Sequence, residues 1–260
     1  MKITIIGAGN IGSAIAGGLI RSKIITGSDL IVSDINQKSL DAIKKLDSNI
    51  TITTNNMESV SKAEMVILAV KPWLIESVLS DLSNNLSNDT ILVSIAAGVD
   101  FEFLVHTINK QITMFRVMPN TAISIGESMT LIASQNATKD QEAYILNMFS
   151  QLGKALLIPE KMMGAATSVA SCGIAYALRY LHVSTEGAVE LGFNADIATQ
   201  IVAQTMKGAA QLILTNNSHP KEEIDKVTTP GGWTINGLNE MEAHGFSNAV
   251  IKGLKANEKK

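Results

Sequence analysis

Three glycines near the start of the sequence have the spacing of a phosphate-binding loop. The segment reads Gly7-Ala8-Gly9-Asn10-Ile11-Gly12. It follows an apolar run over residues 3–6 and precedes a helix predicted over residues 13–21. In this context Gly7 permits a tight turn, Gly9 lets the backbone approach a pyrophosphate, and Gly12 lets the helix pack closely on the strand. N–H groups at the start of the helix would face the phosphates, so the segment predicts a dinucleotide-binding site.

An acidic residue stands where such a site would bind a ribose. Asp34 lies 22 residues beyond Gly12, just after a second apolar run over residues 30–32. A carboxylate there accepts hydrogen bonds from ribose hydroxyls and repels a 2′-phosphate, which favours NADH over NADPH. Lys38 is close enough in the sequence to reach a 2′-phosphate, so NADPH remains open. Taken alone, Asp34 is also typical of an ordinary turn after a strand.

Three further loops follow later apolar runs. They are Val70-Lys71-Pro72, Ala96-Ala97-Gly98 and Met118-Pro119-Asn120-Thr121. Ligands of open α/β sheets bind at the carboxyl ends of the strands, so all three loops are expected to border one crevice. Each loop taken singly is equally consistent with a plain turn.

The elements that would position these loops alternate along the first part of the chain. Short apolar runs cover residues 3–6, 30–32, 65–70, 91–95, 112–115, 130–133 and 156–158, and stretches long enough for helices cover residues 13–21, 37–46 and 75–82. Continuous apolar runs suit strands buried on both faces, as in a parallel sheet. The alternation therefore predicts an α/β domain with a doubly wound sheet of the Rossmann type.

Beyond Pro159 the β-branched runs largely stop. Residues 162–191 are rich in Ala, Ser and Gly, and residues 195–214 carry apolar side chains at roughly helical spacing. Gly192 and Asn216-Asn217 are placed to end two helices. The predicted domains are a dinucleotide-binding domain over residues 1–159 and an all-helical domain over residues 160–260.

The composition excludes several classes of protein. With 21 basic and 24 acidic residues among 260 and a mean hydropathy of +0.20, the chain is too apolar to be disordered. A net charge of −3 offers no electrostatic basis for binding nucleic acid. No apolar run reaches the roughly 18 residues of a membrane span, and glycines interrupt the first turns too often for a signal peptide. With a single cysteine, and four histidines in no metal-binding spacing, we expect a cytoplasmic protein without a metal.

Longer motifs give the sequence a specific resemblance. The matching residues are Gly7–Gly12 with Ala14 and Gly17-Gly18, Ala69-Val70-Lys71-Pro72, Ala97-Gly98-Val99, Arg116-Val117-Met118-Pro119-Asn120-Thr121, Ala166-Thr167, Gly173 with Ala175-Tyr176, Glu186-Gly187-Ala188, Gln204-Thr205-Met206-Lys207-Gly208-Ala209-Ala210, His219-Pro220, Val227-Thr228-Thr229-Pro230-Gly231-Gly232-Trp233-Thr234 and Gly237-Leu238. The Arg-x-Met-Pro-Asn-Thr and Pro-Gly-Gly-x-Thr segments are far more specific than the glycine spacing. Over essentially its whole length, the sequence resembles the pyrroline-5-carboxylate reductase family.

The resemblance implies an activity and a site. In this family NAD(P)H delivers a hydride to the imine carbon of 1-pyrroline-5-carboxylate, giving L-proline, and the helical domain binds substrate and dimerises. The implied catalytic residues are Thr234 and Lys71. The implied cofactor-binding residues are Gly7, Ala8, Gly9, Asn10, Ile11, Gly12, Ser33, Asp34, Asn56, Ala69, Val70, Lys71, Pro72, Ala97, Gly98 and Asn120. The implied substrate-binding residues are Thr167, Thr229, Pro230, Gly231, Gly232, Trp233 and Thr234.

The chemistry of that reaction agrees with the residues present. A protonated cyclic imine is already an electrophile. Hydride transfer to it therefore needs a well-positioned substrate and a binding site for the substrate carboxylate more than it needs a strong base. Residues 229–234 offer adjacent glycine N–H groups and threonine hydroxyls to a carboxylate. Three residues depart from the family pattern: Cys172 replaces a serine, Ile174 a proline, and Trp233 the first threonine of Pro-Gly-Gly-Thr-Thr. We expect these changes to alter the preferred substrate size within the same reaction class.

Two other functions remain open. A 3-hydroxyacid dehydrogenase also joins a Rossmann domain to helices, but it would need a catalytic lysine after a glycine-rich turn, and residues 164–176 contain none. A nucleotide-binding relative that has lost its chemistry would fit the changes at Ile174 and Trp233.

Sparse charge in the second half predicts self-association. Residues 162–191 carry charges only at Arg179, Glu186 and Glu190, with His182 as a possible fourth. A helical domain that is this small and apolar cannot cover both of its faces alone. We therefore expect a homodimer, or a larger assembly built from it.

Overall fold

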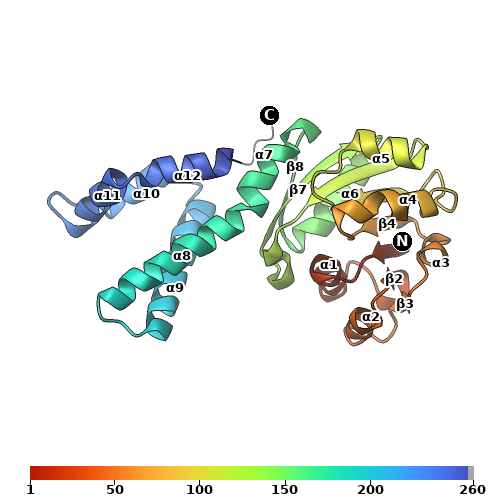
Figure 1. The fold of residues 1–260 in the computed structure, drawn as a ribbon, viewed down its shortest axis with the longest axis horizontal. Helices are drawn as coiled ribbons and strands as arrows, with labels where there is room; N and C mark the ends of the chain where they lie inside the picture. The colour runs from red at the N-terminus through yellow and green to blue at the C-terminus, as the bar shows by residue number, and fades with distance from the viewer. Residues whose placement is uncertain (257–260) are drawn as a thin grey trace. The chain divides into compact units, whose positions relative to one another are not determined.

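The computed structural model describes residues 1–256, which fall into two compact units that divide between Ser171 and Cys172 (Figure 1). The first unit extends beyond the proposed boundary at residues 159/160. It does so because Met163 and Ala166 are buried in a core cluster of the sheet.

One eight-stranded sheet forms the centre of the first unit (Figure 1). Its strands are β1 (Ile3–Ile6), β2 (Leu30–Ser33), β3 (Thr51–Thr53), β4 (Met65–Leu68), β5 (Ile91–Ser94), β6 (Thr113–Met118), β7 (Ser128–Gln135) and β8 (Gly153–Leu157). The order across the sheet is β3-β2-β1-β4-β5-β6-β7-β8, and neighbours among the first six run parallel. β7 runs antiparallel to β6, and β8 runs parallel to β7.

The parallel direction expected from the apolar runs is wrong for the last two strands. Only residues 119–127 join β6 to β7. A parallel crossover takes about a dozen residues or more, so this short connection returns the chain antiparallel. The sequence patterns also missed β3, because two of its three residues are threonines and it forms no apolar run.

Helices cover both faces of the sheet. They are α1 (Asn10–Arg21), α2 (Gln37–Lys44), α3 (Asn56–Val60), α4 (Ile75–Leu82), α5 (Phe101–Ile108) and α6 (Lys139–Ser150), with short 3₁₀ turns η1 (Gly27–Asp29), η2 (Pro72–Leu74) and η3 (Thr121–Ile125). One core cluster joins Ile3 and Ile5 of β1 to α1, α2 and α6, and the other joins Ile6 to α3, α4 and α5. The predicted helices in α1, α2 and α4 and the doubly wound arrangement are confirmed.

Capping side chains decide where several helices begin. Thr138 and Gln141 form a reciprocal capping box at the start of α6. Asp100 accepts a hydrogen bond from the N–H of Phe103 at the start of α5. Each cap satisfies donors that have no partner within the helix.

A helical stretch leads away from β8. It consists of η4 (Glu160–Met162), α7 (Met163–Ala166) and the π-helical turn η5 (Thr167–Ser171). The second unit follows with α8 (Gly173–Glu190), α9 (Ala195–Asn216), α10 (Pro220–Lys226), α11 (Trp233–Ala243) and α12 (Phe246–Lys255). The helix predicted over 195–214 is confirmed as α9, and it ends where Asn217 takes a left-handed φ of 50°. Residues 162–191 are helical as expected, but η5 interrupts them with a π turn.

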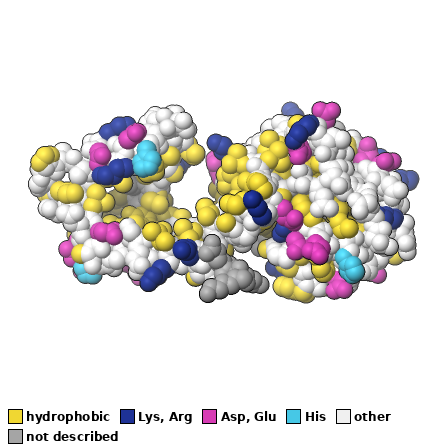
Figure 2. Space-filling view, turned by 90° about the horizontal axis from the view of Figure 1, so that it is seen from above, with side chains coloured by type: hydrophobic (Ala, Val, Ile, Leu, Met, Phe, Trp, Pro, Cys, Tyr) yellow, Lys and Arg dark blue, Asp and Glu magenta, His cyan; other side chains and the backbone are white. Residues whose placement is uncertain are grey.

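The second unit has almost no interior of its own. Among its described residues, Ala198 alone is buried. Large apolar side chains are exposed on its helices and on the connection between α8 and α9: Leu178, Val183, Val189, Leu191, Phe193, Ile197, Ile201, Leu212, Leu214, Phe246, Val250 and Ile251. Figure 2 shows hydrophobic side chains gathered around a hollow of this unit. Apolar exposure on this scale marks an interaction surface. No helix within residues 1–256 combines the length and hydropathy that crossing a bilayer requires.

Candidate cofactor and substrate site

Two of the three loop glycines are required by the protein's own backbone. Gly7 has a φ of +107°, and a Cβ there would lie 2.6 Å from the carbonyl oxygen of Ala69, which follows β4. A Cβ on Gly12 would lie 1.9 Å from the carbonyl oxygen of Gly7. A Cβ on Gly9 would meet no protein atom within 4 Å, so this position faces open space. The loop therefore has the shape of a cradle whose open side fits a pyrophosphate.

The start of α1 completes this cradle. α1 begins at Asn10, after Gly9 as its N-cap, and its first turn contains no acidic side chain. The first N–H groups of a helix have no partner within it, and the helix dipole places partial positive charge there. A dinucleotide's phosphates fit both features.

Asp34 follows β2 and lies against the glycine-rich loop. Its Oδ2 accepts a 2.5 Å hydrogen bond from the N–H of Ala8, and its Oδ1 accepts one of 2.8 Å from the N–H of Asn36. Beside it, the Ser33 hydroxyl donates to Oδ1 of Asn56 over 2.6 Å, linking the end of β2 to the start of α3. The carboxylate is thus held in one orientation by backbone donors, with lone pairs remaining for ribose hydroxyls.

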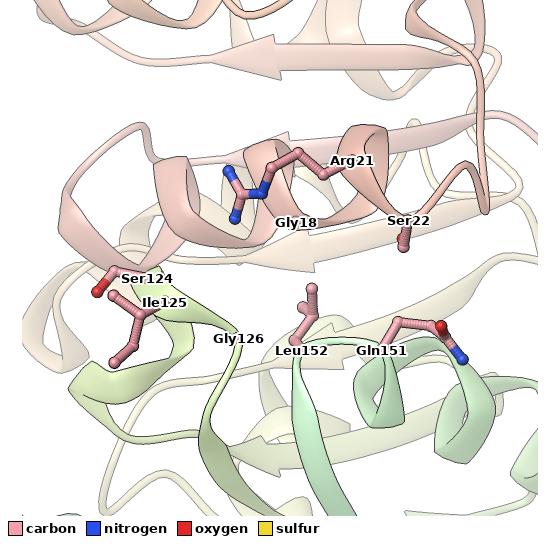
Figure 3. Close-up of a pocket in the computed structure, with 8 residues that line it drawn as sticks. All are labelled: Gly18, Arg21, Ser22, Ser124, Ile125, Gly126, Gln151 and Leu152. Carbon is pink, nitrogen blue, oxygen red and sulfur yellow. The ribbon is translucent and has the colours of Figure 1, made fainter.

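A groove of about 630 Å³ runs beside α1, from the glycine-rich loop toward α2 and η3. Gly9 and Asn10 line one part of it, Leu46 follows α2, and Ser124 belongs to η3. Arg21 and Ser124 also border a second cavity of about 370 Å³ at the other end of α1 (Figure 3). Figure 3 shows the Arg21 side chain lying along α1 above this cavity. None of the predicted site residues lines the second cavity.

The remaining strand-end residues lie where the sheet topology requires. Ala69 donates its N–H to the carbonyl of Ile6 over 2.7 Å, which holds the ends of β1 and β4 together. Lys71 is exposed and precedes Pro72, the first residue of η2. Gly98, after β5, has a φ of +78° and open space where a Cβ would stand. Because β1, β4 and β5 are parallel neighbours, these residues share the carboxyl edge of the sheet.

Asn120 follows β6 at the same edge, but its polar atoms are already engaged. Its N–H donates to the Ser128 hydroxyl over 3.1 Å, and its Oδ1 accepts from the N–H of Ala122 over 3.0 Å. Its Nδ2 donates to the carbonyl of Ala170 over 3.2 Å. Asn120 is only 6% exposed. The bond to Ala170 connects the loop after β6 to the π-helical turn.

The predicted substrate residues are divided between the two units. Thr167 belongs to the first unit, where its hydroxyl donates to the carbonyl of Met163 over 2.8 Å. Residues 229–234 belong to the second unit. There Gly231 has a φ of +67°, and the N–H of Gly232 donates to the carbonyl of Thr229 over 3.0 Å.

This turn leads straight into a helix. α11 begins at Trp233, and Thr234 is its second residue. Residues 229–232 therefore lie directly before a helix N-terminus. The Trp233 side chain is 95% exposed, so within its own unit it makes little contact.

Two of the four histidines lie close to a glutamate on the same helix. His182 Nε2 lies 3.5 Å from Oε1 of Glu186, and His244 Nδ1 lies 3.5 Å from Oε1 of Glu240. In each pair the two side chains are exposed and stand four residues apart in the sequence. Within residues 1–256, no group of three or more His, Cys, Asp or Glu side chains is placed to hold a metal ion.

One ion pair near the site was missed from the sequence. Arg116 of β6 is 8% exposed, and its Nη1 lies 2.8 Å from Oε1 of Glu160. The same oxygen accepts a 2.8 Å hydrogen bond from the N–H of Phe101. Arg116 appeared in the sequence only as part of a motif, and Glu160 carried no signal, because the two residues are 44 positions apart.

Comparison with known proteins decides between the reductase family and the dehydrogenase. The family model for pyrroline-5-carboxylate reductase dimerisation matches residues 160–260, and a model for coenzyme F420-dependent NADP oxidoreductases matches residues 2–98. A pyrroline-5-carboxylate reductase from Methanosarcina acetivorans is 37% identical over 257 residues, which cover 96% of this chain and 94% of the relative. The chain belongs to the pyrroline-5-carboxylate reductase family.

Other members of this reductase family agree in sequence and fold. Pyrroline-5-carboxylate reductase 1 of Dictyostelium discoideum is 36% identical over 97% of this chain, which spans only 48% of that relative's length. The structure of a Coxiella burnetii pyrroline-5-carboxylate reductase has a TM-score of 0.92 and 27% identity, covering 98% of this chain and 95% of that one. A Plasmodium falciparum pyrroline carboxylate reductase with NADP bound has a TM-score of 0.89 and 26% identity, covering 99% and 95%.

The rival dehydrogenase is similar in fold alone. A Mycobacterium tuberculosis 3-hydroxyisobutyrate dehydrogenase has a TM-score of 0.55 and 11% identity, covering 75% of this chain and 67% of that one.

Proposed function

We propose that this chain reduces 1-pyrroline-5-carboxylate to L-proline with NAD(P)H. The observation that carries the proposal is membership of the reductase family along nearly the whole chain, joined to a glycine cradle that fits a dinucleotide. When bound, NAD(P)H would supply a hydride to the imine carbon of the protonated ring, whose nitrogen would keep its proton as the amine forms.

In this proposal the chain's residues act by binding and orienting. The glycine-rich loop and the start of α1 hold the pyrophosphate. Lys71, Ala97 and Gly98, at the carboxyl edge of the sheet, border the nicotinamide half of the cofactor. Residues 229–234 grip the substrate carboxylate through glycine N–H groups and threonine hydroxyls, with Thr234 near the ring nitrogen.

The direct test measures NADH oxidation with and without 1-pyrroline-5-carboxylate. Turnover that requires the imine supports the reductase. Cofactor binding without turnover supports the alternative of a nucleotide-binding relative that has lost its chemistry. Thr234→Ala should raise KM for the imine about tenfold while leaving NADH affinity unchanged, since one charge-assisted hydrogen bond contributes roughly 1.5 kcal/mol. Thr199→Ala is the matched control, because that hydroxyl only donates to the carbonyl of Ala195 within α9.

We infer a preference for NADH over NADPH. The Asp34 carboxylate, fixed by the N–H groups of Ala8 and Asn36, would repel a 2′-phosphate. The test compares kcat/KM for the two cofactors in the wild type and in Asp34→Asn, which removes the charge but keeps an acceptor for Ala8. We expect NADH to be preferred, and the preference to shrink in Asp34→Asn. A large NADPH preference in the wild type would contradict this role for Asp34.

We further infer that the protein is a cytoplasmic homodimer. Exposed apolar side chains on α8, α9 and α12, together with the match to a dimerisation family, support self-association. Sedimentation equilibrium should give at least twice the 27.7 kDa of one chain. A stable monomer that turns over the imine would contradict the inference.

Trp233 and Ile174 are proposed to tune substrate size. The bulk of an indole beside the grip would narrow the space for the ring. Steady-state kinetics with the five-membered imine and its six-membered analogue, for the wild type and Trp233→Thr, test this. If the wild type and Trp233→Thr prefer the five-membered imine over its six-membered analogue to the same degree, the proposal is contradicted.

A further inference from the structure

The loop that follows β6 is joined to the π-helical turn by hydrogen bonds running in both directions. Asn120 Nδ2 donates to the carbonyl of Ala170 over 3.2 Å. In return, the Ser171 hydroxyl donates to the carbonyl of Pro119 over 3.2 Å. The Thr167 hydroxyl lies 3.0 Å from the sulfur of Met118. Three successive residues, 118–120, thus hold the turn, and we name these contacts the π clamp.

The orientation of the Asn120 amide follows from its two neighbours. Its oxygen accepts the N–H of Ala122 at the start of η3, and its nitrogen donates to Ala170. A flipped amide would place donor against donor and oxygen against oxygen. Both ends of the amide are hydrogen-bonded to other residues of the protein, and only 6% of Asn120 is exposed.

The turn that the π clamp holds is not a favourable structure by itself. π-helical turns are rare and occur mostly as single turns, often at functional sites. Here Ser168 is only 4% exposed, and its buried hydroxyl has no hydrogen-bond partner among the described residues. A buried polar group without a partner disfavours the conformation that contains it. The turn therefore needs bonds from outside the helix to keep its shape.

The place of the π clamp gives it a role in the reaction. β6 is parallel to β5, and its carboxyl end lies at the same sheet edge as Lys71 and Gly98. We propose that Asn120 and Ser171 are positioning residues, which hold the π turn with Thr167 at the edge where the nicotinamide is proposed to bind. The side chain of Asn120 then acts through the protein and not by contacting the cofactor. This inference rests on the proposed reductase function, and misplacement by about 1 Å can lower such a rate about a hundredfold.

Asn120→Asp is the decisive substitution because it keeps the shape and the acceptor for Ala122. It removes the donor to Ala170 and sets a carboxylate oxygen against that carbonyl. Asn136→Asp is the matched control, since Asn136 Nδ2 donates to the carbonyl of Ile112 over 3.3 Å at the opposite edge of the sheet. Ser171→Ala removes the second bond of the π clamp by a milder change.

The measurements are kcat/KM for 1-pyrroline-5-carboxylate, the NADH dissociation constant by fluorescence titration, and amide hydrogen exchange over residues 167–171. For Asn120→Asp we expect kcat/KM to fall about tenfold or more, NADH affinity to stay within about twofold, and exchange to accelerate. Ser171→Ala should act in the same direction, and the double variant should lose less than the product of the two single losses. Asn136→Asp should match the wild type.

Two results would overturn the inference. One is a tenfold weaker NADH affinity in Asn120→Asp, which would mean direct cofactor contact. The other is unchanged kcat/KM and unchanged exchange in both clamp variants. If Asn120→Asp does not fold, Ser171→Ala and its exchange data decide alone. A wild type that never turns over the imine refutes the proposed function, whereas the exchange measurement still tests the clamp.

Discussion

The partly buried ion pair between Arg116 and Glu160 should contribute more to stability than an exposed pair of the same length. Glu160→Ala removes a carboxylate that accepts bonds from Nη1 of Arg116 and from the N–H of Phe101, both over 2.8 Å. The Arg116 side chain is 10% exposed, so its guanidinium would remain buried without a partner.

The magnitude follows from burial. Breaking a fully buried pair from one side costs about 3–5 kcal/mol. The Glu160 side chain is 35% exposed, and water can reach part of the vacated space, which lowers the expected loss to about 2–3 kcal/mol. For a unit of this size, each kcal/mol lowers Tm by roughly 2–4 °C. We therefore expect thermal unfolding, at one fixed protomer concentration, to show a fall in Tm of about 4–12 °C. Urea unfolding should show the free energy of unfolding lowered by the same amount, about 2–3 kcal/mol.

Lys139 and Glu142 provide the matched control. Their Nζ–Oε2 distance is also 2.8 Å, but the lysine side chain is 94% exposed, so Lys139→Ala should cost less than about 0.5 kcal/mol. A double variant, Arg116→Met with Glu160→Leu, should regain much of the loss, because no charge is left buried. If Glu160→Ala costs no more than Lys139→Ala, or the double variant is less stable than the single one, the reasoning is refuted.

The remaining predictions concern the cradle and the carboxylate of Glu223. Gly12→Ala should abolish cofactor binding and lower Tm, because the added Cβ would lie 1.9 Å from the carbonyl oxygen of Gly7. Gly9→Ala should fold normally with an unchanged Tm, because its Cβ would meet no protein atom within 4 Å. In a titration, this second variant should show only weaker NADH binding. Hydrogen bonds from Lys226 and Ser218 lower the pKa of Glu223 to about 2 from the ordinary 4.5. Since the folded pKa is depressed, its stabilising effect is complete above pH 4.5 and is lost as the pH falls toward 2; a carbon-13 NMR titration should show that midpoint, and Lys226→Ala should move it upward.

Local features of the site were predictable because their causes are local. A tight turn with positive φ, a helix start and a strand end each depend on a few adjacent residues, so Gly7, Gly9 and Gly12 and the position of Asp34 followed from spacing. The helix end at Asn217 followed for the same reason. Contacts between distant residues left no such trace. Asn120 gave no sign that its amide binds Ala170, 50 positions away.

The sequence by itself determined the fold class and the family, and it predicted the residues proposed to hold a dinucleotide, because glycine spacing, apolar periodicity and extended motifs are local features of the chain. Only the tertiary structure decided the reversed direction of β7 and β8, the Arg116–Glu160 pair and the clamp on the π turn. These depend on which segments meet in space, and burial there sets the energy of each polar contact. The nearly absent interior of the second unit shows the same division: the sequence indicated surplus apolar surface, and the structure showed that the unit's own helices leave it exposed.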